Sequence, residues 1–332
     1  MRSYESRASL QQEHRLGGET SNMGLIQVDD YSLSGWREPI RSEGRARWYC
    51  ERLEDGEILV FSSPPFELAA DDRALLLGAR QVNTAHHKNI SYKPSRDRVS
   101  GLSRDAAAER DLRRVMRSYS QGVVNFLSHF LTPYAGRWRV DFASFRPLEE
   151  EGRDLPVRMR NDLLHVDSFP TRPSNGDRIL RVFTNLHPSR ARVWLTGEPF
   201  PVLAARYGEA AGIPKLAGKF RSPWRPARRS LLRFGRRLGV PVIDRPLYDE
   251  FMLGFHHYLK TNSEFQRESQ KSKWEFPPGS TWMVFTDGVP HAVLSGRFAL
   301  EQTFIIHRDA LLAPQKAPYN VLQNLAGVLV TD

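Results

Sequence analysis

The chain has 332 residues, of which 40% are hydrophobic and 11% aromatic, so it is long and apolar enough to bury a sizeable core. Its single cysteine, Cys50, excludes an internal disulfide, a zinc ribbon and a thiolate cluster, and is typical of a reducing compartment. The first twenty residues are polar and lack the apolar segment of a secretory signal peptide. No apolar stretch reaches the roughly 18 residues that a bilayer-spanning helix requires. We therefore expect a cytoplasmic protein.

In chain order, a polar leader over residues 1–24 comes first, followed over 25–77 by short strand-like runs such as GEILVFSS. From about 104 to 131, apolar residues recur every three or four positions. This spacing predicts a long amphipathic helix that ends before Pro133.

The second half of the chain alternates strand-like runs with turns. The first runs are GRWRVDFASFRP, LLHVDSFP, DRILRVFTNLH and ARVWLTGEP. A basic insertion then occupies about 204–242, Pro246 begins a second helix, and strands return in STWMVFTD and RFALEQTFII. Strands on both sides of a long insertion predict an α+β, mainly β fold, a double-stranded β-helix (jelly roll, cupin-like) barrel with flanking helices. We expect one domain over 25–332.

The net charge of +10 is concentrated in the basic insertion. Between Lys215 and Arg237 there are nine Lys or Arg residues and no Asp or Glu. Such a run favours an anionic partner, which could be phosphate, nucleic acid or a lipid head group. A solvated loop without a partner explains the same composition, so charge alone leaves both interpretations open.

The motif that carries the most chemical information is His165-Val166-Asp167. On a strand, residues two apart point to the same face, so this spacing aims an imidazole and a carboxylate into one space. His291 follows the strand TWMVF far downstream, where a neighbouring strand of the same barrel would present it. Two histidines and one carboxylate form the facial triad of non-haem iron oxygenases, which leaves positions for a cosubstrate and dioxygen.

A catalytic zinc site and a purely structural role for the histidines remain alternatives to iron. The supply of arginines favours iron, because 2-oxoglutarate needs a cation for its distal carboxylate and the planar guanidinium group suits it. Arg181, Arg192 and Arg297 lie on or beside predicted barrel strands, although surface charge is the ordinary role of most arginines. His256 and His257 are adjacent in the second helix, so their side chains diverge and cannot both bind one metal ion.

Three long segments carry a resemblance to a known family. They are LLHVDSFPTRPSNGDRILRVFTNLHPSRARVW, YDEFMLGFHHYLK and FPPGSTWMVFTDGVPHAVLSGRFALEQTFII. The chain resembles, from about residue 25 to 322, the Kdo hydroxylases, which are iron(II)- and 2-oxoglutarate-dependent dioxygenases acting on 3-deoxy-D-manno-oct-2-ulosonic acid. By this resemblance His165, Asp167 and His291 match the iron ligands.

The resemblance also implies roles for other residues. Arg146, Arg181, Arg192 and Trp194 fall in stretches that line the family's active site. Arg146 and Arg192 are candidates for the sugar-acid carboxylate, and the indole of Trp194 for an apolar wall. Where the wider superfamily commonly has an arginine for the distal carboxylate of 2-oxoglutarate, this chain has Gln302 and Thr303. Arg297, Arg181 and Arg192 therefore compete for that carboxylate, and we expect Arg297 or Arg181 to bind it.

The implied reaction hydroxylates carbon 3 of Kdo in the inner core of lipopolysaccharide. It consumes O₂ and 2-oxoglutarate and yields succinate and CO₂. Kdo-lipid A is the expected partner, and the basic insertion, which mixes cations with Trp224 and Phe234, would hold the protein on the anionic cytoplasmic face of the inner membrane.

Two other functions compete with this one. A nucleobase demethylase would use the basic insertion on phosphates, but no array of base-stacking aromatics is evident, so no nucleic acid is expected. A metal-binding barrel without catalysis, tethered to lipopolysaccharide, would never consume 2-oxoglutarate.

Overall fold

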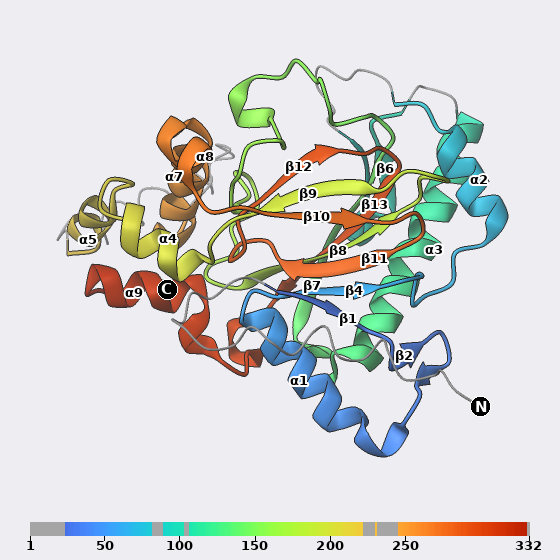
Figure 1. The fold of residues 1–332 in the computed structure, drawn as a ribbon, viewed down its shortest axis with the longest axis horizontal. Coiled ribbons are helices and arrows are strands. Elements are labelled where there is room, and N and C mark those ends of the chain that lie inside the picture. The colour runs from blue at the N-terminus through green and yellow to red at the C-terminus, as the bar shows by residue number, and fades with distance from the viewer. Residues whose placement is uncertain (1–23, 82–88, 103–105, 222–229, 231–244, 331–332) are drawn as a thin grey trace, which may run out of the picture.

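Two β-sheets face each other at the centre of the molecule, with helices around them (Figure 1). The computed structural model describes residues 24–81, 89–102, 106–221, 230 and 245–330. The large sheet has the strand order β1-β4-β11-β8-β13-β7-β5-β6 and the small sheet the order β10-β9-β12. The strands of the large sheet are β1 (Leu25–Gln27), β4 (Ile58–Phe61), β5 (Ile90–Lys93), β6 (Arg98–Ser100), β7 (Trp138–Arg146), β8 (Arg178–Asn185), β11 (Thr281–Phe285) and β13 (Ala299–Ile306). Those of the small sheet are β9 (Arg192–Thr196), β10 (Ser272–Phe276) and β12 (His291–Ser295).

The path of the chain between the sheets has the alternation of a double-stranded β-helix. From β7 onward the chain passes back and forth between the sheets, except that β9 and β10 follow one another within the small sheet. A short extended segment at His165 lies beside β12 through a bridge to His291. With this segment, four strands of each sheet make up the barrel, β11-β8-β13-β7 in one and β10-β9-β12 plus the His165 segment in the other. The predicted mainly β jelly roll is therefore confirmed.

Side-chain alternation gives the central strands of the large sheet two different faces. On the outer face, apolar residues such as Leu180 and Val182 pack with the helices α1 (Ser42–Glu54) and α3 (Ala106–Phe130) in the largest core cluster. On the inner face, Phe183 and Trp282 pack against Trp194 of the small sheet. The inner face also carries charged residues, and these form the site described below.

Most of the remaining helices lie together at one end of the barrel, on the left in Figure 1. They are α4 (Phe200–Tyr207), α5 (Ile213–Arg221), α7 (Leu247–Thr261), α8 (Ser263–Glu268) and α9 (Pro318–Ala326), and they share a second core cluster. Elsewhere in the described ranges lie α2 (Ala70–Gly78), the small ribbon β2 (Tyr31–Ser32) and β3 (Gly35–Trp36), and several short 3₁₀ turns. These turns are η1 (Pro39–Arg41), η2 (Pro94–Arg96), η3 (Thr132–Tyr134), η4 (Val157–Met159), η5 (Arg308–Ala310) and η6 (Pro314–Lys316).

Both long predicted helices are present close to their expected positions. The helix predicted over about 104–131 is α3, and Pro246 directly precedes α7 as its N-cap. The predicted basic insertion begins with α4 and α5, whereas most of its arginines lie outside the described residues, as does the leader up to residue 23.

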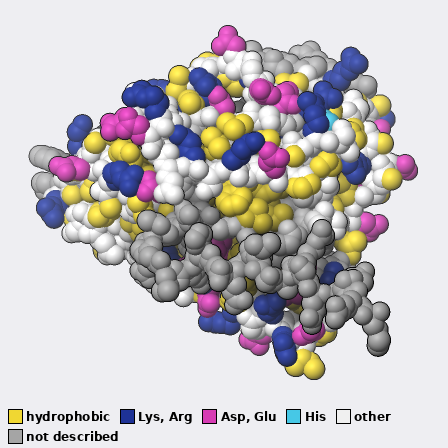
Figure 2. Space-filling view, viewed as in Figure 1, with side chains coloured by type: hydrophobic (Ala, Val, Ile, Leu, Met, Phe, Trp, Pro, Cys, Tyr) yellow, Lys and Arg dark blue, Asp and Glu magenta, His cyan; other side chains and the backbone are white. Residues whose placement is uncertain are grey.

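No helix in the described ranges combines the length and the apolar character that crossing a membrane requires. On the face of the molecule in Figure 2, Lys and Arg side chains are dispersed among Asp and Glu side chains.

Candidate active site and metal centre

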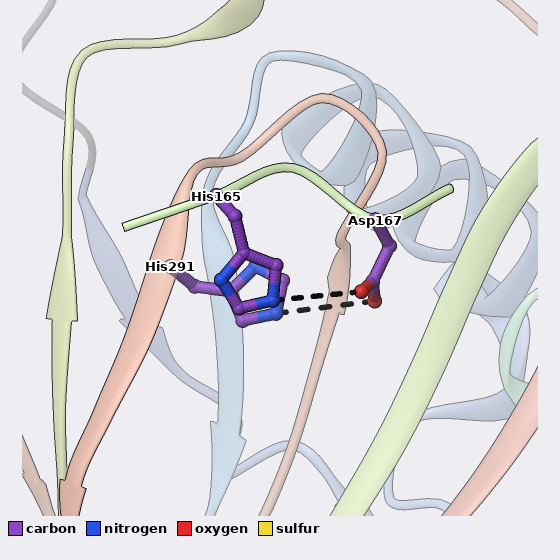
Figure 3. A group of neighbouring side chains, drawn as sticks. All are labelled: His165, Asp167 and His291. Carbon is purple, nitrogen blue, oxygen red and sulfur yellow. Dashed lines mark ion pairs between the residues drawn. The ribbon is translucent and has the colours of Figure 1, made fainter. Parts of the chain in front are cut away.

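His165, Asp167 and His291 meet at one end of the barrel, as the sequence predicts. All three are buried, and one ligand atom from each lies within 4.8 Å of the others. His165 Nε2 is 3.8 Å from Asp167 Oδ1, and His291 Nε2 is 3.9 Å from Asp167 Oδ2. Figure 3 shows both imidazole rings on one side, facing the carboxylate. Because these separations exceed a hydrogen bond, the three groups border a common space instead of binding one another.

Backbone hydrogen bonds fix how the two histidines face this space. His165 Nδ1 donates to the carbonyl of Leu163 at 2.7 Å, and His291 Nδ1 donates to that of Val289 at 3.0 Å. A neutral imidazole that donates from Nδ1 carries its lone pair on Nε2, which is the atom that faces Asp167 in both cases. The two segments are held together by backbone hydrogen bonds between His165 and His291 in both directions. These residues therefore fit a divalent iron ion, for which they supply two nitrogen ligands and one oxygen ligand.

The charge states of the three residues also suit metal binding. Burial, reinforced for His165 by its neighbour His291, lowers the pKa of both histidines, so they are neutral near pH 7. Burial alone would raise the pKa of Asp167, but the positive charge of Arg181, followed by the two imidazoles, holds it far below its usual value. Neutral imidazoles and an ionised carboxylate are the forms that bind a metal ion.

A chain of buried charges extends from Asp167 across the inner face of the large sheet. Arg181 Nη1 donates to Asp167 Oδ2 at 2.6 Å, and its Nη2 lies 2.5 Å from Glu301 Oε1. The other oxygen of Glu301 accepts from Arg146 Nη2 at 2.5 Å. Between these two guanidinium groups the pKa of Glu301 is lowered to about 2, although burial opposes the shift. Asp167 is thus positioned by a network that is ionised throughout the ordinary pH range.

A cavity of about 650 Å³ opens beside the triad. Its described lining is rich in cations and aromatic groups: Asn89, Arg146, Arg158, Asn161, His165, Asp167, Ser168, Phe169, Pro170, Arg181, Phe183, Arg192, Trp194, Leu253, His256, His257, Lys260, His291 and Val293. Five of these residues are Arg or Lys and one is a carboxylate, so the cavity suits anionic ligands. Arg192 and Trp194 at the barrel interior are 1% exposed, whereas Arg158 is exposed and marks the mouth.

Four of the five predicted residues outside the triad reach this cavity: Arg146, Arg181, Arg192 and Trp194. Trp194 lies flat against one metal-ligand candidate, because its ring centroid is 5.3 Å from that of His291 with an interplanar angle of 21°. We predicted from the sequence that Trp194 forms an apolar wall for the sugar. In the structure its ring also stacks on His291.

Arg297 is placed differently from the prediction. It lies in the turn between β12 and β13, where Gly296 and Phe298 have φ angles of 114° and 59°, and this turn directs its side chain outward. The guanidinium group stacks on Phe298 at 4.2 Å and is exposed, and Arg297 is absent from the described lining of the cavity. This position gives no support to the prediction that Arg297 binds 2-oxoglutarate, which stays a prediction.

One side of the cavity was missed by the sequence interpretation. Leu253, His256, His257 and Lys260 of α7 all line it. Their spacing of three, four and seven residues places them on one face of the helix, a signal that was available in the sequence. His256 lies with its ring 4.9 Å from that of His165 and donates through Nδ1 to the carbonyl of Val166 at 2.7 Å. It therefore supports the extended segment that carries the first two triad residues.

A double-stranded β-helix with two histidines and one carboxylate beside a cationic cavity defines a class, the non-haem iron(II) dioxygenases that use 2-oxoglutarate. The family model for 3-deoxy-D-manno-oct-2-ulosonic acid (Kdo) hydroxylase matches residues 36–328. The chain belongs to the Kdo hydroxylase family.

Solved structures of the Kdo hydroxylase KdoO, a non-haem Fe(II) α-ketoglutarate-dependent dioxygenase, are similar over nearly the whole chain. Its apo form and its complex with α-ketoglutarate and Fe(III) are each 31% identical, cover 93% of this chain and 98% of their own, and give a TM-score of 0.78. Its cobalt(II) complex is 32% identical, with coverages of 92% and 97% and the same TM-score. No curated protein matches the chain in sequence. The predicted family, enzyme class and requirement for iron(II), 2-oxoglutarate and O₂ are confirmed.

Proposed function

We propose that this protein hydroxylates carbon 3 of Kdo in Kdo-lipid A, within the inner core of lipopolysaccharide. The products are the 3-hydroxylated sugar acid (Ko), succinate and CO₂. The observation that carries the proposal is the cationic cavity beside the triad, because both the sugar acid and 2-oxoglutarate are carboxylates. A volume of about 650 Å³ is within the usual range for sites that bind small molecules.

We assign the metal ligands to His165, Asp167 and His291. When bound there, iron(II) supplies the activation of dioxygen, with electrons from the oxidative decarboxylation of 2-oxoglutarate. The protein itself holds the two imidazoles neutral, keeps the carboxylate ionised through Arg181 and surrounds the reacting atoms with buried side chains. Excluding water in this way limits side reactions.

For the distal carboxylate of 2-oxoglutarate, Arg146 and Arg192 suit best. Arg181 already has both neighbouring carboxylates as partners, whereas Nε of Arg146 and Nε of Arg192 are buried without a hydrogen-bond partner in the described part of the chain. Arg146 Nη1 lies 3.7 Å and Arg192 Nη2 lies 3.6 Å from Glu150 Oε1, so both ion pairs are long. Arginines with open donors in the barrel interior match a small dianionic cosubstrate that enters before the larger lipid.

A spectroscopic titration followed by turnover tests the chemistry and the substrate separately. Iron(II) and 2-oxoglutarate added without oxygen should give the weak visible charge-transfer band of the chelate. Admitting oxygen with Kdo-lipid A should then bleach the band, release succinate and add one oxygen to the lipid. A band without lipid oxidation would discard Kdo-lipid A as the substrate, and no band while iron binds would discard the triad as the cosubstrate site.

The partner surface of the protein is proposed to be the anionic cytoplasmic face of the inner membrane, with the basic insertion at about 204–242 as the contact. Each basic side chain near such a surface contributes about 1 kcal/mol, so four replacements should release the protein from anionic vesicles. The replacements are Arg228→Gln, Arg229→Gln, Arg236→Gln and Arg237→Gln, which lie outside the described residues. A control removes four exposed arginines elsewhere, by Arg37→Gln, Arg41→Gln, Arg45→Gln and Arg47→Gln. Equal vesicle binding by both variants would contradict the assignment of this segment.

A further inference from the structure

Lys260 is a buried cation that has no assigned role in binding the metal ion or 2-oxoglutarate. It sits on the last turn of α7, is 4% exposed, and lines the cavity from the helix side. Its ammonium group donates to the carbonyl of Arg158 at 3.2 Å and forms no ion pair within the described ranges of the chain. An ammonium group has three N–H donors, and the described residues provide this one acceptor for them.

Such a group is costly for the folded protein. Removing an ammonium from water without a counter-charge costs several kcal/mol, and a lysine in this position is usually either paired or replaced. Burial lowers the pKa of Lys260 to about 8, while the negative charges of Asp167 and Asp162 oppose the shift. The cation is therefore retained near pH 7 although no described residue forms an ion pair with it, which is expected of a residue whose partner is a ligand.

The position of Lys260 separates it from the arginines of the barrel interior. Arg146 and Arg192 come from β7 and β9, whereas Lys260 comes from α7, beside the exposed Arg158 at the mouth. It is still close enough to the triad for its charge to lower the pKa of His165 and of His291. A ligand group bound here would therefore meet a cation presented by the helix side of the cavity, separate from the strand-borne arginines proposed for the cosubstrate carboxylate.

The chemistry of the proposed substrate matches this place. In a 3-deoxy-2-ulosonic acid the carboxylate is carbon 1, so it is two bonds from carbon 3. An anchor for the carboxylate close to the metal centre therefore fixes the carbon that is to be hydroxylated. We propose that Lys260 binds the carboxylate of the sugar-acid substrate and positions carbon 3 at the metal centre. This inference rests on the proposed function and adds a specificity residue to it.

The test pairs a change in the protein with a change in the ligand. Lys260→Met should raise the KM for Kdo-lipid A about 30-fold or more, as expected when one partner of a buried charge pair is removed. The affinity for 2-oxoglutarate, measured by titration of the cobalt(II)-loaded protein, should stay the same. The KM of the wild-type enzyme should rise by a similar factor when the substrate is the carboxyl methyl ester of Kdo-lipid A. For Lys260→Met, the ester and the free acid should have the same KM. Lys260→Arg should restore part of the loss.

Stability separates this role from a structural one. Because the ammonium is buried and forms no ion pair with a described residue, Lys260→Met should unfold at the same temperature as wild type or higher, whereas loss of a structural lysine would lower that temperature. Lys273→Met is the matched control, since Lys273 is exposed and pairs with Glu275 on β10, and it should leave all values unchanged. Should Lys260→Met not fold, Lys260→Gln takes its place.

Three results would overturn the inference. In the first, Lys260→Met leaves the KM for Kdo-lipid A unchanged. In the second, it weakens only the binding of 2-oxoglutarate; in the third, the KM increases caused by the ester and by Lys260→Met multiply when both changes are combined. Failure of the proposed function is distinct, because in that case the wild-type enzyme would not oxidise Kdo-lipid A at all.

Discussion

Replacing Arg181 by Met tests whether the buried charge network positions the metal ligand Asp167. The change removes the guanidinium group that donates to Asp167 Oδ2 at 2.6 Å and lies 2.5 Å from Glu301 Oε1. Methionine keeps much of the volume, so the main loss is electrostatic. Asp167 is then left without its cation, while Glu301 keeps Arg146.

The expected magnitude follows from the burial of these carboxylates. The pKa of Glu301 falls from 4.5 to about 2, which corresponds to about 3 kcal/mol in favour of the charged form, shared between Arg181 and Arg146. Breaking a buried ion pair by removing one partner costs about 3–5 kcal/mol. Because Glu301 retains one arginine, we expect the lower end, a loss of about 3 kcal/mol in the free energy of unfolding. Loss of the group that orients Asp167 should weaken metal binding about 10- to 100-fold.

Two measurements check this prediction. Urea unfolding of the metal-free protein gives the change in stability, and titration with cobalt(II), followed in the visible spectrum, gives the change in metal affinity. Arg160→Met is the matched control, because its ion pair with Asp162 is more than one-third exposed on both sides and is worth at most about 1 kcal/mol. If Arg181→Met behaved like Arg160→Met in both experiments, the network would have no role in holding Asp167.

Three further predictions concern the triad and the titration of its neighbours. His165→Ala and Asp167→Ala should each abolish cobalt(II) binding and succinate formation but leave the circular dichroism spectrum unchanged; retained turnover in either would mean that the metal is elsewhere. The stabilising effect of ionised Glu301 is complete above its unfolded pKa of about 4.5 and is lost as the pH falls toward its folded pKa of about 2. The difference in the free energy of unfolding between wild type and Glu301→Gln should therefore shrink over that pH range. A constant difference would contradict this prediction. Since the pKa of Lys260 is about 8, the free enzyme loses this charge above about pH 8, and the KM for Kdo-lipid A should rise there in wild type but not in Lys260→Arg; parallel pH profiles would argue against the anchor.

The sequence determined those features that depend on local periodicity. The spacing of apolar residues predicted α3, and Pro246 marked the start of α7, because helix formation follows from contacts three and four residues apart. The two-residue spacing of His165 and Asp167 placed both ligands on one face, which is a property of any extended segment. The position of His291 just after the strand TWMVF made it the candidate for the third ligand, and the long family-specific segments then indicated the enzyme class.

Only the tertiary structure decided which cations face the metal centre. Arg181 and Arg297 are equivalent in sequence terms, but strand register turns the first toward Asp167, while a turn with two positive φ angles directs the second to the surface. Lys260 was not recognised as a site residue, because the direction of α7 relative to the barrel, set by its packing in the second core cluster, determines that its polar face covers the cavity. The partners of a side chain across a barrel depend on contacts between distant segments, and no local pattern encodes them.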